Sequence, residues 1–484
     1  VAIAFALLRP AGATLDRSAL AGGIALVLVA LASGRGIGAR RDEGSATPIA
    51  AAWLVAASIS GAIGLLQAFD LAALLQPWLH AAAPGEAIGN LRQRNQLASL
   101  LAIGFAASLW FASQGARLRW LVPMVLVLAV ATAATTSRTG LLHWLLLSVL
   151  AVLWAGASRR RIVLLCGAGL AAYGVAVLGL PALLERVADV VPANLVTRVA
   201  TDLGCSSRTV LWSNVLELIA QRPLLGWGWG ELDYAHYMHL YSGPRFCDIL
   251  DNAHNLPLHI AVELGIPAAL LFCGAVAGGI WRGRPWAERD PQRQLAWSVV
   301  AVIGVHSLLE YPLWYAPFQI ALGLALGLLL ARPPAEPAAM PMPARGRSLV
   351  VAGCALLLAY AGWDYLRVSQ IYLEPQQRLA PWRDDTLAHV RRSWLFAGQA
   401  GFAELTLTDL TPRTVHRVDA LAQAMLHYSP EPRVIEKALE SATMQERDDD
   451  AVLHLARYRT AFPDDYARWR KEQKLPIGLR PQAP

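Results

Sequence analysis

The chain alternates long apolar stretches with short polar or arginine-bearing turns as far as residue 366, and then changes character. A transmembrane helix needs about 20 mostly apolar residues to cross the hydrocarbon core of a bilayer. Ten stretches fit this requirement: 17–34, 48–69, 95–113, 119–136, 139–157, 162–180, 256–280, 295–311, 313–331 and 348–366. The opening "VAIAFALLRP" is too short to span and is expected to be the end of an earlier helix. The pattern predicts an all-α, polytopic membrane bundle of about 10–12 spans.

Composition also indicates a membrane protein. Hydrophobic residues make up 55% of the 484 residues and charged residues 16%, against about 25% charged residues in soluble domains. The net charge of +7 is almost entirely due to arginine, because lysine occurs only at positions 437, 471 and 474. The sequence has no basic stripe interleaved with aromatic residues, the pattern that would indicate nucleic-acid binding. The charge is therefore interpreted as a topology signal.

The arginines of the turns fall on alternate loops and so define two sides of the bundle. The positive-inside rule assigns such loops to the cytoplasm, and it applies to Arg35, Arg40, Arg41, Arg117, Arg119, Arg159, Arg160, Arg161, Arg282, Arg284, Arg289, Arg293, Arg332, Arg345 and Arg347. The periplasmic side then receives the long loop and the tail. We expect four units: N-terminal spans in 1–180, a periplasmic loop in 181–255, C-terminal spans in 256–366 and a periplasmic helical domain in 367–484.

The loop 181–255 is too long for a simple connection, since loops beyond about 15 residues are usually functional or disordered. Its segment "SSRTVLWSNVLELIAQRPLLG" predicts a helix with an N-cap at Ser206 or Ser207 and an end near Pro223 and Gly226. The "GWGWG" that follows indicates a tight bend with two tryptophans, which either anchor at the membrane interface or stack on a substrate. The loop is therefore expected to have helical structure of its own.

The tail from 367 to 484 is charged and shows helical periodicity, with Pro430 and Pro463 ending two similar helix-like units. It is expected to be either an ordinary helical domain or a repeat that binds a partner. The cysteines of the outer loop, Cys205 and Cys247, lie in a compartment that permits disulfides. We predict that they are bonded and hold the helix of Arg208 beside the segment of His254, the alternative being two unrelated thiols. The other three cysteines lie in predicted spans and are expected to pack as small apolar residues: Cys166, Cys273 and Cys354.

Polar and ionisable residues gather at the predicted outer interface, where such groups are costly and usually functional. They are Gln93 and Arg94 in "RQRNQLA", Arg138 in "SRTG", Arg208, His254 and Asn255 in "AHN", and Glu310 with Tyr311 in "HSLLEYPLWY".

Each of these residues also has a structural alternative. Arg138 could cap a hairpin or reach to the interface, and Arg208 could be a solvated helix residue. Glu310 could pair with an arginine and have His306 as its hydrogen-bond partner, and His254 could be a satisfied core histidine. The spacing of Asp248, Asp251 and His254 is not a recognised metal-ligand set. We therefore expect neither a metal nor another cofactor.

The motifs "RQRNQLA", "SRTG", "RTVLW" with "PLLGWGWG", "AHNLPLHIAVELG" and "HSLLEYPLWY", in this order, resemble the bacterial O-antigen ligase and polymerase superfamily. The resemblance covers roughly residues 85–330, and "AHN" after an arginine-headed helix is a fairly specific part of it. The ending "EYPLWY" and the folded tail look most like the protein O-oligosaccharyltransferase branch.

The resemblance implies a metal-independent enzyme on the periplasmic side of the bacterial inner membrane. It would move a glycan from undecaprenyl diphosphate to a hydroxyl of a protein acceptor such as pilin. The alternatives within the superfamily are ligation to lipid A-core and O-antigen polymerisation. A lipid-linked glycan transporter or flippase is the alternative of another class; few charges inside the spans and no matching pair of broken helices speak against it.

The roles follow from the chemistry of the transfer. His254 would be the base, because an imidazole titrates near neutral pH. Arg208 and Arg138 would bind the departing diphosphate, because planar guanidinium groups match phosphate oxygens. The remaining residues would line the donor or acceptor path: Gln93, Arg94, Asn255, Glu310 and Tyr311, with Tyr315 as the alternative tyrosine.

Overall fold

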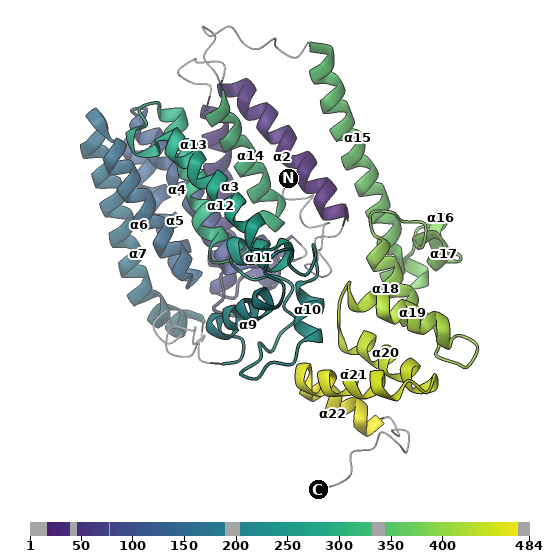
Figure 1. Cartoon of the computed structure of the whole chain (residues 1–484). Coiled ribbons are helices and arrows are strands. Elements are labelled where there is room, and N and C mark those ends of the chain that lie inside the picture. The colour runs from purple at the N-terminus through teal and green to yellow at the C-terminus, as the bar shows by residue number, and fades with distance from the viewer. Residues whose placement is uncertain (1–16, 39–45, 77, 189–203, 332–343, 473–484) are drawn as a thin grey trace.

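A computed structural model describes residues 17–38, 46–76, 78–188, 204–331 and 344–472 (Figure 1). Each of the ten predicted spans coincides with helix: α2 (Arg17–Gly38), α3 (Thr47–Ala68), α4 (Arg94–Ser113), α5 (Leu118–Ala134), α6 (Arg138–Trp154), α7 (Arg159–Ala188), α11 (Leu256–Leu264) with α12 (Ile266–Gly283), α13 (Pro291–Ser307), α14 (Ala316–Leu330) and α15 (Ala344–Ser369). Among the described helices, 4 are long and apolar enough to cross a membrane, and shorter apolar helices accompany them. The predicted class of multi-pass helical membrane protein is confirmed. The partial span expected before residue 17 lies outside the described residues.

α4 runs through the centre of the main bundle. It is buried along most of its length and packs against α3, α5, α6 and α13. Small residues permit this packing, since a Cβ on Gly104 would lie 2.3 Å from the Cβ of Ala57 in α3. Phe105 stacks on Trp144 of α6, with ring centroids 4.0 Å apart. The first turn of α4, which carries site residues, is thereby held in place.

A second group of helices consists of α2, α14 and α15. α14 packs along α2, and α15 stands beside α2 at the edge of the bundle (Figure 1). Glycines bring α2 and α14 together, since a Cβ on Gly327 would lie 2.4 Å from the carbonyl oxygen of Leu31. α12 differs in that its large apolar side chains, Leu270 and Leu271 among them, are exposed. An apolar helix surface of this kind is suited to contact with lipid.

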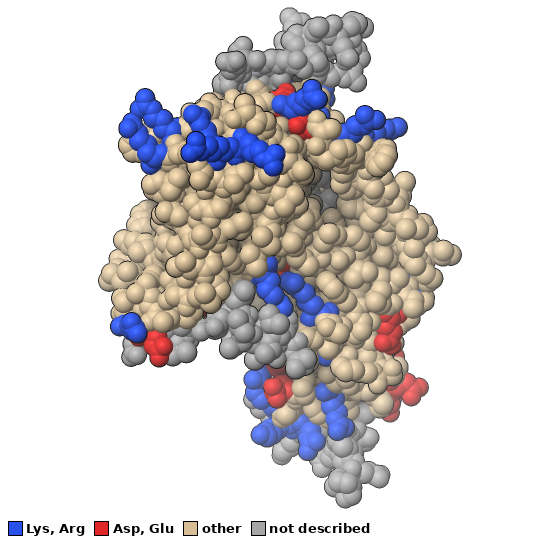
Figure 2. All heavy atoms as spheres, turned by 90° about the vertical axis from the view of Figure 1, so that its left-hand side faces the viewer, with Lys and Arg blue, Asp and Glu red and all other residues tan. Residues whose placement is uncertain are grey.

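Basic side chains line the edge of the bundle that lies opposite the outer loop and the tail (Figure 2). They belong to the turns between α4 and α5, between α6 and α7 and between α12 and α13, or to the helix ends beside these turns, and are Arg117, Arg119, Arg159, Arg160, Arg161, Arg282, Arg284 and Arg289. The arginines that alternate along the sequence thus gather on one side in space.

The predicted span 256–280 is not a single helix. It breaks at Gly265, and its first part, α11, packs on the outer-loop helix α9 (Arg208–Gln221). Gly265 has a φ of 89°, a left-handed value that favours glycine. A Cβ there would lie 2.1 Å from the carbonyl oxygen of Leu224, because the chain of "LLGWGWG" crosses the break. The apolar residues of α11 therefore contribute to the core of the outer loop.

That core joins α9, α10 (Leu232–Met238) and α11 through Leu211, Val215, Leu218, Leu232 and Val262. α9 begins after Ser207, whose hydroxyl accepts the backbone N–H of Val210 at 3.3 Å. Ser207 is therefore the N-cap, and Ser206 is not. This cap makes Arg208 the first residue of α9.

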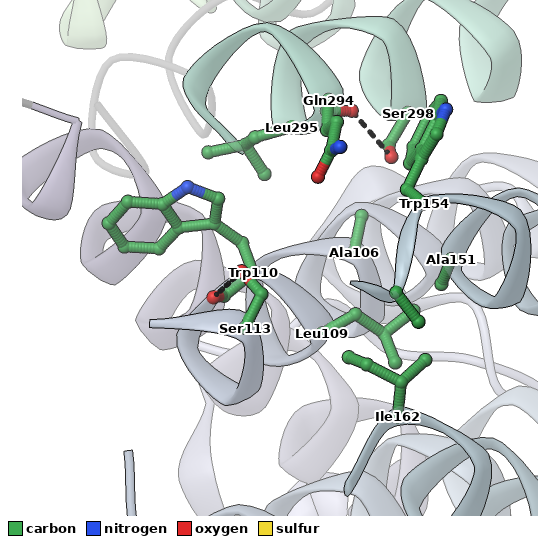
Figure 3. A pocket seen from close by; sticks show the side chains of 11 residues that line it. Ala106, Leu109, Trp110, Ser113, Ala151, Trp154, Ile162, Gln294, Leu295 and Ser298 are labelled. Carbon is green, nitrogen blue, oxygen red and sulfur yellow. Dashed lines mark hydrogen bonds between the residues drawn. The ribbon is translucent and has the colours of Figure 1, made fainter. Parts of the chain in front are cut away.

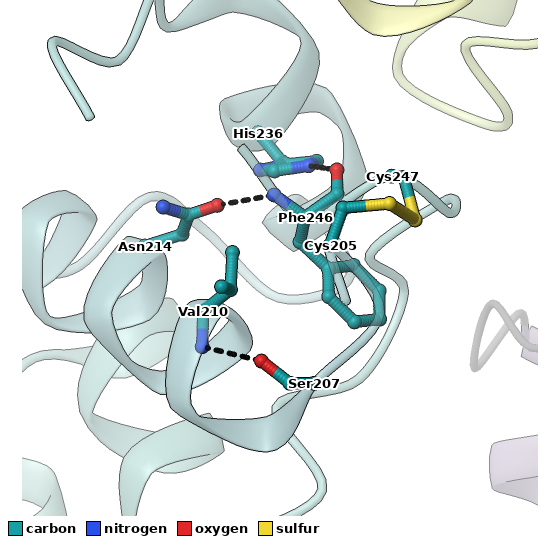
Figure 4. The surroundings of a disulfide bond; sticks show 7 residues. All are labelled: Cys205, Ser207, Val210, Asn214, His236, Phe246 and Cys247. Carbon is teal, nitrogen blue, oxygen red and sulfur yellow. Dashed lines mark hydrogen bonds between the residues drawn. A yellow bond between two sulfur atoms is a disulfide. The ribbon is translucent and has the colours of Figure 1, made fainter. Parts of the chain in front are cut away.

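A disulfide joins Cys205 and Cys247, the pair for which the sequence predicts one (Figure 4). Their Cα atoms are 5.4 Å apart, although the residues are separated by 42 positions. Beside the bridge, the side chain of Asn214 in α9 accepts the backbone N–H of Phe246 at 2.8 Å, and Nε2 of His236 in α10 lies 3.2 Å from the carbonyl oxygen of the same residue. The segment before His254 is thus fastened to both loop helices.

The tail consists of consecutive helices: α16 (Ala380–Arg383), α17 (Thr386–Val390), α18 (Ala397–Leu407), α19 (Val415–Leu426), α20 (Pro432–Met444), α21 (Asp448–Ala461) and α22 (Pro463–Glu472). Pro430 lies between helices, whereas Pro463 is itself the first residue of α22. The tail contacts the outer loop through Tyr237 of α10, which is buried in the core of the tail and whose hydroxyl lies 2.9 Å from Nδ1 of His454. Loop and tail therefore share a packed contact.

Candidate active site

Glu310 gathers hydrogen-bond donors from three segments that are far apart in the sequence. It lies in the turn between α13 and α14, and only 6% of its surface is exposed. Its Oε1 accepts from Nη2 of Arg208 at 2.5 Å and from Nδ2 of Asn95 at 2.9 Å. Its Oε2 lies 2.8 Å from Nδ1 of His254 and accepts from Nε2 of Gln93 at 3.3 Å. Both carboxylate oxygens are therefore paired, as burial of a charge requires.

Two opposing effects act on the pKa of the Glu310 carboxyl. Burial raises this pKa, whereas the hydrogen bond from His254, the charge of His254 and the charge of Arg208 lower it, and the net pKa is below the ordinary value. Glu310 is therefore ionised at neutral pH.

His254 lies in the turn that precedes α11. Its φ of 49° is left-handed, and its backbone N–H donates to Oδ1 of Asn252 at 2.9 Å. A carboxylate can only accept, so in the neutral ring Nδ1 carries the proton and donates to Glu310. The opposite nitrogen, Nε2, is then the one that can take up a proton. Tyr311 meets the imidazole edge-on, with ring centroids 4.9 Å apart.

Two of the predicted residues are helix N-caps. Gln93 caps α4 by accepting a backbone N–H of the first turn at 3.2 Å, while its amide nitrogen donates to Glu310. Asn255 caps α11 in the same way at 3.0 Å, and its amide nitrogen donates to the carbonyl oxygen of Leu308 at 3.0 Å. Capping satisfies N–H groups that a helix leaves unpaired. Asn255 thus joins α11 to the turn after α13, and its predicted contact with substrate stays a prediction.

The structure brings Asn95 and Ser137, which are not among the site residues expected from the sequence, into the same network. Asn95, in the first turn of α4, donates to Glu310, and its Oδ1 accepts from the hydroxyl of Ser137 at 2.7 Å. Ser137 is the N-cap of α6, and Arg138 is the first residue of that helix, with an exposed side chain. The start of the Arg138 helix is thereby linked to Glu310. A polar residue in the first turn of an otherwise apolar helix is the signal that points to Asn95.

Arg94 and His306 have other side-chain partners. Arg94 pairs with Glu86 at 3.2 Å, in the segment before α4. The side chain of His306 does not bind Glu310, because its Nδ1 lies 2.8 Å from the hydroxyl of Ser99 in α4. Its carbonyl oxygen instead accepts the backbone N–H of Glu310 at 2.8 Å. The role predicted for Arg94 in substrate binding stays a prediction.

Tyr311 and Tyr315 stack beside this cluster, with ring centroids 5.8 Å apart. Burial raises the pKa of both phenols. Both hydroxyls therefore remain protonated at neutral pH and can donate hydrogen bonds. Of the two, Tyr311 is the one whose ring touches His254.

The cluster thus combines an oriented imidazole, an ionised carboxylate and a guanidinium group at one end of a membrane bundle. Such a set can remove a proton from a hydroxyl and bind an anion at the same place. Within the described ranges, no group of three or more His, Cys, Asp or Glu side chains is arranged to hold a metal ion.

Three families match the chain. The family described as "Protein glycosylation ligase" matches residues 87–112, "O-Antigen ligase" matches 123–273, and "Virulence factor membrane-bound polymerase, C-terminal" matches 294–475. These segments carry the residues that meet at Glu310: the start of α4, α9 with the turn of His254, and the turn after α13. Each family matches less than half of the chain, and together the matches make the chain similar to O-antigen ligases and protein glycosylation ligases.

Two relatives from Acinetobacter baylyi are similar to parts of the chain. The chain is 26% identical over 290 residues to a "General O-oligosaccharyltransferase", a match that covers 57% of this chain and 49% of the relative. It is 27% identical over 124 residues to a "ComP-specific O-oligosaccharyltransferase", covering 26% and 22% of the two chains. The chain thus spans half or less of these relatives. No solved structure matches it. Over these parts, the chain is similar to O-oligosaccharyltransferases.

Proposed function

We propose that this protein transfers a glycan from undecaprenyl diphosphate to a hydroxyl of a protein acceptor of the pilin type. The observation that supports this proposal most directly is that one carboxylate, Glu310, binds both His254 and Arg208. The proton acceptor and the anion-binding group of such a transfer are thereby held at one place. The names of the two relatives support an oligosaccharide as the transferred group.

In the proposed reaction, the acceptor hydroxyl attacks the anomeric carbon of the donor glycan. The bond from that carbon to the phosphate oxygen breaks, and its electron pair leaves with the diphosphate. Nε2 of His254 takes the hydroxyl proton as the new glycosidic bond forms. The imidazolium is then stabilised by Glu310, which also holds the ring in the tautomer that leaves Nε2 free to accept.

The leaving diphosphate gains negative charge as the bond breaks, and guanidinium groups can stabilise it. Arg208 uses Nη2 on Glu310 and is still 30% exposed, which leaves donors of its planar fork for a phosphate. Arg138 is exposed at the start of α6 and is proposed to contact the same diphosphate. The two arginines would bind the anion from separate helices.

The membrane position of the site suits a lipid-linked donor. The site residues start α4, α6 and α9 or lie in turns between helices, at the end of the bundle away from the arginine-rich edge (Figure 2). By the positive-inside rule, that end faces the periplasm of the bacterial inner membrane. The diphosphate of a polyprenyl carrier lies at this depth. The four units 1–180, 181–255, 256–366 and 367–484 are proposed as two sets of spans, a catalytic loop and a periplasmic domain.

The base is tested with His254→Ala in a reconstituted assay that contains lipid-linked glycan and acceptor. Transfer should fall by about 10²–10⁴-fold, the usual contribution of a general base. The matched control is His416→Ala, an exposed histidine of the tail, which should retain wild-type transfer. Normal turnover in the His254 variant, with unchanged insertion into the membrane, would remove the base from this position.

The acceptor class is tested separately, by offering wild-type protein the same lipid-linked glycan with a pilin-like protein or with lipid A-core. We expect glycosylation of the protein alone. One matching family is described as an O-antigen ligase and another as a polymerase. Two outcomes would therefore contradict a protein acceptor: transfer to lipid A-core, or growth of the lipid-linked glycan itself.

A further inference from the structure

A crevice opens between α4, α6, α7 and α13 at the end of the bundle that lies away from Glu310 (Figure 3). The space inside it that admits a water-sized molecule is about 40 Å³, and the crevice continues into open solvent. Its walls are largely apolar and include Trp110, Ser113, Ala151, Trp154, Ile162 and Gln294. The crevice is thus separate from the candidate active site.

Some of the lining residues carry polar groups. The side chain of Gln294 lies at the crevice wall (Figure 3), and its amide nitrogen donates to the carbonyl oxygen of Glu288 at 2.9 Å. Nε1 of Trp110 is buried, finds no acceptor among the described residues and is closed off from the crevice. The attraction of the crevice for an occupant therefore depends on its apolar walls and on the charges at its opening.

Exposed arginines lie on the side of the opening where α7 begins, whereas the α12–α13 turn on the other side carries both acidic and basic residues. Ile162, which lines the crevice, follows the run Arg159, Arg160 and Arg161, and all three arginines are exposed. Nη1 of Arg161 would lie 3.5 Å from a Cβ on Gly115, so its guanidinium reaches the α4–α5 turn just beyond Ser113 of the crevice. The turns 114–118 and 155–161 contain arginines and neither Asp nor Glu. These two turns therefore supply no acidic partner for the arginines at the opening.

From this juxtaposition we propose that the crevice binds an anionic phospholipid, with Arg161 on its phosphate and an acyl chain between α6 and α13. A basic pocket between membrane helices suits an anionic headgroup. The apolar walls suit a hydrocarbon chain, which a free phosphate ion does not offer. A zwitterionic lipid would bring a positive amine toward the arginines, so it fits less well. Topology alone explains arginines at this edge but not a crevice beneath them.

The test measures binding of dioctanoyl phosphatidylglycerol to the purified full chain in a neutral detergent, by thermal unfolding and by native mass spectrometry. A ligand that binds the folded state raises the unfolding temperature. Arg161→Gln should weaken the apparent affinity about tenfold, as expected for loss of one charge-assisted hydrogen bond. Ala151→Phe should also weaken the affinity, because the larger side chain fills the crevice. If Ala151→Phe does not fold, Ala151→Leu is the substitute variant.

The matched control is Arg186→Gln, which removes the same charge at the other end of the same helix and should bind like wild type. Dioctanoyl phosphatidylcholine and inorganic phosphate are the two ligand controls, and both should bind much more weakly. Equal phosphatidylglycerol binding by wild type, Arg161→Gln and the Ala151 variants would overturn the proposal. So would stabilisation by inorganic phosphate as strong as that by the lipid.

Discussion

Nδ1 of His254 lies 2.8 Å from Oε2 of Glu310, although 56 positions separate the two residues. The other oxygen of the same carboxylate binds Arg208, which is 102 positions away. A carboxylate that orients a histidine is a recurrent device for fixing the tautomer of a base. Here it also ties the proposed base to a cation, so a change at Glu310 should affect both.

Glu310→Gln is expected to reduce transfer without abolishing membrane insertion. The amide keeps the shape of the side chain but loses the charge that stabilises the imidazolium of His254. The measurement is kcat beside the unfolding temperature and the affinity for the lipid-linked donor, with Glu310→Asp, which keeps the charge, as the comparison. Equal kcat in wild type and Glu310→Gln would show that Glu310 does not act on the proposed base.

The same carboxylate makes a pH-dependent contribution to stability. Its pKa in the folded protein is below the ordinary value of 4.5, so its stabilisation is fully present above that value. It is lost as the pH falls through the folded pKa. The difference in unfolding temperature between wild type and Glu310→Gln should therefore be large at pH 7 and should shrink as the pH falls below about 4.5. A difference that grew in acid would contradict the assigned direction.

Arg208→Lys is expected to lower transfer by about 10²-fold, the order of loss when one charge-stabilising donor is removed. Lysine keeps the charge but cannot hold Glu310 and a phosphate through one planar group. Arg138→Lys should weaken donor binding in the same direction, and Arg413→Lys, in an exposed part of the tail, serves as the control. The measurement is the affinity for lipid-linked donor together with kcat. Wild-type donor binding in both variants would assign the diphosphate to other residues.

The disulfide between Cys205 and Cys247 should contribute about 3–4 kcal/mol to stability, because it closes a loop with a sequence separation of 42. Paired replacement by serine should lower the unfolding temperature and expose the outer loop to protease. The control replaces Cys354, a free cysteine in α15. If both cysteines of the wild-type protein were alkylated without reductant, the bond would be absent.

Gly226→Ala and Gly265→Ala should destabilise the outer loop. Both glycines have positive φ, and a Cβ would lie 2.3 Å from the Glu263 backbone at Gly226 and 2.1 Å from the Leu224 carbonyl oxygen at Gly265. Two controls separate the causes: Gly230 has a positive φ but open space, and Gly243 has open space without a positive φ. In limited proteolysis, the loop should be cleaved fastest in Gly226→Ala and Gly265→Ala and more slowly in Gly230→Ala. Gly243→Ala should be cleaved at the wild-type rate. Equal resistance in all four would show that the crossing tolerates a side chain.

Transfer should survive treatment with a chelator of divalent ions, since the proposed reaction uses only side chains of the chain itself. The measurement compares initial rates before and after chelation. Loss of activity that one specific ion restores would contradict this prediction and would draw attention back to Asp248, Asp251 and His254.

Local patterns suffice to predict the spans, because a helix in lipid must satisfy its backbone hydrogen bonds internally and must show about 20 apolar residues to the hydrocarbon. They also suffice for the start of α9, since Ser207 is a cap residue ahead of a helical apolar period. The break at Gly265 has a local signal, because Gly265 is followed by Pro267 within the run 256–280. The contact made at the break does not: the "LLGWGWG" chain that passes over it comes from about 40 positions earlier in the sequence.

The candidate residues themselves are visible in the sequence as polar groups next to apolar runs, and Gln93, Arg208 and His254 do meet at Glu310. Their partners are not visible. Whether Glu310 binds His254 or His306, and whether Arg94 or Asn95 faces it, depends on the direction in which each side chain leaves its helix. Those directions are set by how α4, α9 and α13 pack against one another, and helix packing is a property of distant contacts that no local pattern contains.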